Sequence, residues 1–343
     1  MVRTMPSLRA LFPASRRVRP APHTAQGLPP DGDVLLDAPD DRLGPALVAA
    51  ALGDHEPAAK LLATTRGGAE WENRDRYTAR LATFAHSRGE WLAHWLAASP
   101  DDPDARLVEA ELAVRRAWQS PARAERLREL GPLVDAVVAA DPADPVPCRL
   151  ALDHARGAHA GDAAFETRWE QAVRRSSHHY GCHVAALKYL SAPWHGSHRA
   201  CVDFAEQAAD DAPAGALVQA LPVRAAAAQL LSGDAAGAVP QARIDAAAER
   251  AIALSAAYPV GDPWPAEVRN LLVYVLVERG RGVEAAEQFR RIGPYATSFP
   301  WASVSDDPLA RFLEARDGVR HLEAAVRPRF GRAGHSRAHG HYA

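Results

Sequence analysis

Apolar positions recur along this chain at intervals of three and four residues, and short polar breaks separate one such run from the next. The stretch from Phe165 to Phe204 shows the pattern most clearly. It predicts a helix that ends at a turn at Ser176–Ser177, a second helix from Tyr180 to Leu190, and a third helix after a break at Pro193–Trp194. Helices joined by such tight turns indicate an array of packed helix pairs.

Further helices follow one another in pairs. The expected pairs are 41–53 with 56–64, 73–87 with 90–98, and 104–118 with 122–139. The junctions around Pro100 and Pro142 resemble each other, because in each a helix ends, proline blocks its continuation and an aspartate can cap the next helix. They lie about 42 residues apart, within the range of periods found in helix-pair repeats.

One segment near the C-terminus matches a known repeat more closely. Leu272, Leu276, Gly280, Ala285 and Phe289 are spaced as in a tetratricopeptide unit. The glycine permits the tight turn, the alanine allows close helix approach, and the phenylalanine fills the space between the helices. An ordinary helical hairpin with the same spacing is the alternative. The earlier pairs match less well, so we expect a degenerate array.

Composition supports a helical fold. Alanine, the strongest helix former, is abundant, and the chain has no alternating run of strand length. We therefore predict an all-α fold, a tetratricopeptide-like α-solenoid of stacked helix pairs formed by residues 39–326. Residues 1–38 are expected to be a disordered basic arm, and residues 327–343 a disordered tail rich in arginine and histidine.

Charge, apolar runs and cysteine content limit the partners and the cellular compartment that we expect. The formal net charge of −2 gives no global field toward nucleic acid, although the basic arms leave nucleic acid or anionic lipid as a minor alternative. No apolar run approaches the ~20 residues of a membrane helix, so we expect no membrane association. Cys148, Cys182 and Cys201 are odd in number and lie in expected helices, which favours a reducing cytoplasm.

Histidines gather between His178 and His198. His179 and His183 are four residues apart, hence on one helix face, and His195 and His198 are three apart at the start of the next helix. Two such pairs facing each other could hold Zn²⁺ or another transition metal. No HExxH or CxxC pattern accompanies them, and a histidine at a helix start is more often a cap or a surface group.

Other catalytic patterns are mostly absent. Ser197 does not lie in a Gly-x-Ser-x-Gly turn, and the chain has no phosphate-binding loop, so we expect no enzymatic activity and no cofactor. The weak candidates for partner binding are four side chains that could lie on a concave face of the array: Trp169, Tyr180, His183 and Trp194. Core packing is the alternative for the aromatic ones.

Several segments together resemble a known family. They are Asp141-Pro142, the helix from Phe165 to Val173, His179-Tyr-Gly-Cys-His183, Pro193-Trp-His-Gly-Ser197, Phe204-Ala-Glu, Pro300-Trp301 and Asp307-Pro308. Over roughly residues 40 to 320 the chain is similar to a bacterial family of unknown activity with a tetratricopeptide-like fold, whose members carry a Lys-Trp-Gly-Gly-Ser turn. Pro193 and His195 depart from that turn, where the family has lysine and glycine. The resemblance implies a fold and no mechanism.

Stacked helix pairs form a concave groove that binds peptides or helices. The leading hypothesis is therefore a non-enzymatic protein-protein interaction or scaffold module in the cytoplasm, with an unknown protein or peptide partner. The alternative is a metal- or cofactor-binding protein that uses the cluster from His178 to His198.

Overall fold

A computed structural model describes residues 27–233 and 239–326 of the chain. In this part, α-helices joined by short turns account for most residues, and two strands of two residues each are the only strands. The helices are α1 Leu43–Ala51, α2 Glu56–Gly67, α3 Trp71–Ser87, α4 Glu90–Ala98, α5 Pro103–Trp118, α6 Arg123–Glu129, α7 Gly131–Ala140, α8 Val146–Ala158, α9 Asp162–Arg175, α10 Tyr180–Tyr189, α11 His198–Asp211, α12 Leu221–Ser232, α13 Gln241–Ala256, α14 Ala266–Glu278, α15 Gly282–Ile292 and α16 Pro308–Val326. The all-α prediction is confirmed. Within the described ranges, every helix is too short or too polar to cross a bilayer.

The predicted helices are found with small shifts at their ends, with one exception. The segment 122–139, expected to be one helix, forms two, α6 and α7. Pro132 lies in the first turn of α7, and a proline there has no N–H with which to continue the preceding helix. The predicted hairpin near the C-terminus is formed by α14 and α15. Gly280 adopts a positive φ at its turn, and Ala285 and Phe289 are buried.

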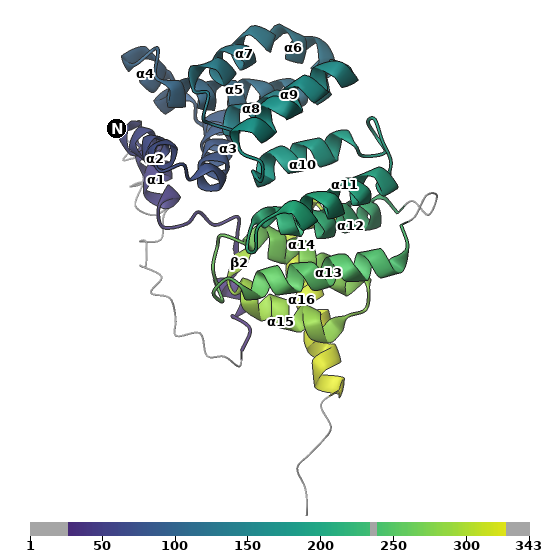
Figure 1. The fold of residues 1–343 in the computed structure, drawn as a ribbon. Coiled ribbons are helices and arrows are strands. Elements are labelled where there is room, and N and C mark those ends of the chain that lie inside the picture. The colour runs from purple at the N-terminus through teal and green to yellow at the C-terminus, as the bar shows by residue number, and fades with distance from the viewer. Residues whose placement is uncertain (1–26, 234–238, 327–343) are drawn as a thin grey trace, which may run out of the picture.

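The apolar core follows the chain in consecutive clusters. They lie among α1–α5, α5–α8, α8–α10, α10–α12 and α12–α16. Each cluster shares a helix with the next, so the apolar surface of one group of helices is covered by its neighbours along the chain. Figure 1 shows the result, with α4–α9 in one part of the molecule, α11–α16 in the other, and α10 between them.

The segment before α1 joins the two parts. Strand β1, Leu35–Leu36, pairs in parallel with β2, Tyr295–Ala296, and Val34 is buried in the cluster of α12–α16. Arg316 Nη1 donates to the carbonyl oxygen of Pro29 at 3.1 Å. In Figure 1 this purple segment runs from α1 along the side of the molecule to β2.

The expected disordered arm of residues 1–38 is therefore wrong for its last part. Leu28, Val34 and Leu36 are apolar side chains that the C-terminal cluster covers. Their pairing partner lies more than 250 residues further along the chain, so no local pattern announces it. Residues 1–26 and the expected tail 327–343 lie outside the described residues.

Candidate functional site: a charged cavity between the two parts

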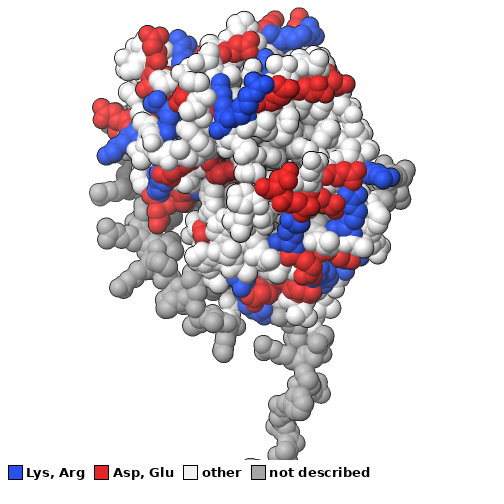
Figure 2. Space-filling view, viewed as in Figure 1, with Lys and Arg blue, Asp and Glu red and all other residues white. Residues whose placement is uncertain are grey.

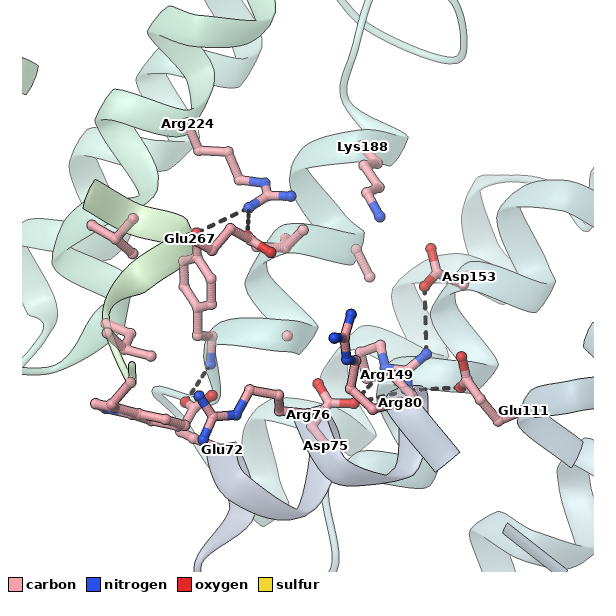
Figure 3. A pocket seen from close by; sticks show the side chains of 18 of the residues that line it. Glu72, Asp75, Arg76, Arg80, Glu111, Arg149, Asp153, Lys188, Arg224 and Glu267 are labelled. Atoms are coloured by element: carbon pink, nitrogen blue, oxygen red, sulfur yellow. Dashed lines mark hydrogen bonds and ion pairs between the residues drawn. The ribbon is translucent and has the colours of Figure 1, made fainter. Parts of the chain in front are cut away.

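A cavity of about 440 Å³ lies where α3, α5 and α8 meet α10, α12 and α14. Its wall contains six basic and five acidic side chains: Arg76, Arg80, Arg115, Arg149, Lys188 and Arg224, with Glu72, Asp75, Glu111, Asp153 and Glu267. They come from six helices that are far apart in the sequence and converge on one space (Figure 3). Such a volume is within the range of sites for small ligands or short chain segments.

Helix α3 forms one wall because its two faces differ. Glu72, Arg76 and Arg80 recur at intervals of four and face the cavity, while Tyr77 and Leu81 are buried in the first cluster. Side chains at this spacing lie on one face of a helix, so the polar stripe of α3 is directed into the cavity by the packing of its apolar stripe.

Arg149 of α8 organises the acidic groups on one side of the cavity. Its Nε donates to Asp75 Oδ1 at 2.9 Å, and its Nη2 lies 2.7 Å from Glu111 Oε2. Asp153 Oδ2 is 3.7 Å from Nη1 and is also paired with Arg156. Burial lowers the pKa of Arg149, but these carboxylates raise it by more. The guanidinium is therefore a fixed cation that holds three helices together.

A second group lies on the side of α12 and α14. Arg224 Nη1 donates to Tyr180 Oη at 3.1 Å and forms an ion pair with Glu267. Burial raises the pKa of Tyr180, which is therefore a neutral phenol at physiological pH. The Arg76 guanidinium stacks over the Trp264 ring at 4.7 Å from its centroid. Both arginines are oriented by aromatic neighbours.

The N-terminus of α10 contacts α3 at one end of the cavity. The Tyr180 N–H donates to Glu72 Oε1 at 2.7 Å. Burial raises the pKa of Glu72, although His179 and this N–H partly offset the effect. His179 caps α10, since its Nδ1 accepts from the Cys182 N–H. The other ring nitrogen of His179, Nε2, lies 3.8 Å from Asp75 Oδ2 and 3.9 Å from Glu72 Oε2.

Lys188 lies at the other end of α10 and extends into the cavity (Figure 3). Its side chain is exposed to solvent, but it lies in a concave space where protein atoms displace much of the bulk water. Asp153 raises the pKa of Lys188, while loss of water and the charges of Arg224, Arg156 and Arg149 lower it by more. Within the described residues its ammonium forms no hydrogen bond or ion pair.

Of the four binding candidates chosen from the sequence, only Tyr180 lines the cavity. Trp169, on α9, is half-buried and packs edge-on against His183 and Phe204. His183 is buried, and its Nδ1–H donates to the His179 carbonyl at 3.0 Å. Trp194 packs against Trp118 and lies over the Arg156 guanidinium at 4.7 Å. The last three are in packed surroundings outside the cavity.

The four histidines considered as metal ligands do not converge. His179 faces α3, His183 faces Trp169, His195 stacks on Tyr189 at 4.4 Å, and His198 lies 3.2 Å from Ser232 Oγ. Across residues 27–233 and 239–326, no group of three or more His, Cys, Asp or Glu side chains is placed to hold a metal ion. The four histidines considered as an alternative metal site are therefore not brought together, because their side chains face different neighbours.

The sequence pattern does not predict the charged groups of the cavity, because no short motif contains them. The one available signal was on α10, where Gly181, Val184, Ala185 and Lys188 recur as one helix stripe with small side chains and a terminal charge. The described part of the outer face in Figure 2 carries acidic and basic side chains interspersed, without the wide basic area typical of nucleic-acid binding.

Comparison with protein-family models, curated proteins and solved structures finds no match to this chain. Functional inference therefore rests on the residues of the cavity themselves.

Proposed function

We propose that this chain is a non-enzymatic binding protein, a tetratricopeptide-like solenoid that takes a segment of a partner protein into the charged cavity. One observation carries the proposal: charged side chains from six helices converge on a single concave space. Most of them are held by ion pairs with one another, so the wall is preorganised, and a polar segment can bind with little side-chain ordering.

The composition of the wall favours binding over covalent catalysis. Among its described residues there is no Ser, Thr, Cys or His, the residues that most often act as nucleophile or as its general base. The three cysteines are buried elsewhere as free thiols, which supports a cytoplasmic location.

The solenoid part of the proposal is supported by the order of the apolar clusters and by the α14–α15 hairpin. Neighbouring helices along the chain bury one another's apolar faces, as in repeat proteins. The resemblance to the bacterial family with the Trp-Gly-Gly-Ser-type turn supports the same fold. Contacts of the segment before α1 would close this array on one side.

Site-specific photo-crosslinking in cells tests the proposal. The photoreactive residue p-benzoylphenylalanine replaces Leu217, which lines the cavity in the 3-10 segment η3, Leu217–Ala220, or Val48, which is 63% exposed on α1. We expect one defined segment of one protein to crosslink at position 217 and not at 48. Filling the cavity with Ala79→Leu should abolish that product. Equal products at both positions, or none at either, would contradict the proposal.

A further inference from the structure

Two charged side chains of the cavity wall lack a Lys, Arg, Asp or Glu partner of opposite sign among the described residues. The other nine of the eleven form ion pairs: Asp75, Glu111 and Asp153 with Arg149, Arg115 with Glu111, Arg224 with Glu267, Arg76 with Asp40, and Arg80 with Asp37. The two that remain are Lys188 and Glu72. Glu72 accepts a backbone N–H and lies 3.9 Å from a histidine, but no lysine or arginine reaches it.

These two groups lie at opposite ends of one helix face. Glu72 contacts the first residue of α10, Tyr180, and Lys188 lies in the last turn of the same helix. Gly181, Val184 and Ala185 line the wall between them. The seven helical steps from Gly181 to Lys188 rise by about 10 Å. Glu72 and Lys188 therefore lie at opposite ends of a floor of Gly, Val and Ala side chains that leaves room for a ligand.

The charges of the cavity wall disfavour a ligand whose charged groups all have the same sign. A ligand with only negative groups would place charge beside Glu72 and leave it without a counter-ion. One with only positive groups would do the same beside Lys188, where Asp153 attracts a cation but Arg224, Arg156 and Arg149 repel it. A ligand with an anion at one end and a cation at the other satisfies both groups, and charge-assisted hydrogen bonds in a partly dehydrated cavity are the stronger kind.

An extended segment in the polyproline II conformation rises about 3.1 Å per residue with three residues per turn, so side chains three positions apart lie on one face, about 9 Å apart. Resting on the proposed function, we infer that the bound segment is extended and carries opposite charges three positions apart. Its anionic group, a carboxylate or a phosphate, pairs with Lys188, and its basic side chain pairs with Glu72. The neighbouring ion pairs of Arg149 and Arg224 with their carboxylates hold the walls in place.

Selection of a phage-displayed random octapeptide library on the full chain tests this inference. We expect wild-type protein to enrich peptides with Asp or Glu three positions from Lys or Arg. Lys188→Met should lose the preference for the acidic residue alone, and Glu72→Gln the preference for the basic one. Each change should weaken a selected peptide about tenfold or more. Lys60→Met on α2 and Glu170→Gln on α9 are exposed matched controls that should select as wild type does.

Charge reversal sharpens the test. With Lys188→Glu both ends are acidic, so the library should yield peptides with two basic residues at the same spacing, and the wild-type peptide should be rejected. Replacing the acidic residue of a selected peptide by phosphoserine distinguishes the two anion sources. Tighter binding assigns the phosphate, and weaker binding assigns the carboxylate.

The outcomes separate the two proposals. Enriched peptides without the charge pair, or binding unaffected by both Lys188→Met and Glu72→Gln, would overturn the charge-pair inference and leave peptide binding standing. No enriched peptide with folded wild-type protein, as judged by circular dichroism, would contradict both.

Discussion

Gly181 of α10 lies directly against the carboxylate of Asp75 of α3, so closely that a β-carbon at position 181 would overlap Asp75 Oδ2. Asp75 is held in place by Arg149, whose Nε donates to it at 2.9 Å. The lack of a side chain at 181 therefore lets α3 and α10 approach each other at the end of the cavity that contains Glu72.

We expect Gly181→Ala to lower the free energy of unfolding by about 1–3 kcal/mol, the usual effect of an added group that forces packed neighbours apart. Chemical denaturation monitored by circular dichroism measures the change. Gly131→Ala is the matched control, since a β-carbon there has nothing within 4 Å, and it should be neutral or slightly stabilising. A stability of Gly181→Ala equal to that of this control would show that the carboxylate moves freely.

Arg74 forms a buried ionic junction in the part that contains α3. It is 1% exposed, its Nη2 lies 2.7 Å from Asp104 Oδ1, and its Nε donates to Asp144 Oδ2 at 2.6 Å. Arg74→Met leaves the buried Asp144 without a counter-ion and Asp104 with Arg66 alone, at 3.2 Å, and should cost about 3–5 kcal/mol. Arg174→Met removes an exposed pair with Glu170 and should cost less than about 1 kcal/mol. Similar losses in both variants would contradict this difference.

Lys188 should be dispensable for stability. Its surroundings hold its pKa below the usual value, so its folded pKa is lower than its unfolded pKa, and at neutral pH its ammonium is stabilised less in the folded chain than in the unfolded chain. We therefore expect Lys188→Met to unfold at the same or a higher denaturant concentration than wild type at pH 7, as is common when a functional charge is removed. Lys60→Met serves as the reference. A clear loss of stability in Lys188→Met alone would show that the lysine is a structural residue.

Two buried histidines should make the fold sensitive to mild acid. Burial lowers the pKa of both His154 and His183, whose rings donate to the carbonyls of Leu127 and His179. The unfolded chain then takes up protons near pH 6.5 while the folded chain resists them, so stability is full above that pH and falls below it. Urea denaturation between pH 7.5 and about 5.5 measures the slope.

The double variant His154→Gln/His183→Asn should flatten this slope, because neither replacement titrates. His94→Gln, at an exposed position on α4, should retain the wild-type slope. If the double variant kept the full slope, other groups would be the source of the acid sensitivity.

The segment before α1 contributes to stability through Val34. This side chain is 5% exposed in the cluster of α12–α16, whereas its neighbour Leu35 is 47% exposed. Val34→Ala should cost about 1–3 kcal/mol through lost burial and the space left behind. Leu35→Ala, at the next position, should change the free energy of unfolding by less than about 0.5 kcal/mol. Thermal denaturation of the two variants compares them, and equal midpoints would exclude a structural role for this segment.

Distance along the chain does not predict distance in the folded protein for either the histidine cluster or the cavity. His179 and His183 are close along the chain, but the first caps α10 and faces α3, while the second faces Trp169. Glu72 and Tyr180 are 108 positions apart and share a hydrogen bond. Spacing along the chain shows which residues share a helix face. The element that this face contacts depends on how distant segments pack.

The helices, the turns between them and the inward position of residues such as Phe289 can be read from the amino-acid pattern alone. These follow from local causes: backbone propensity, capping, proline and the period of the apolar positions, all of which act within a few residues. The positions at which the cavity-lining helix faces meet depend on the packing of the whole chain. Helical periodicity places Glu72 on a polar stripe of α3 and Lys188 at the end of a stripe of small side chains on α10. The cavity that contains both exists because α3 and α10 pack together at Asp75 and Gly181, a contact between distant segments that no local pattern specifies.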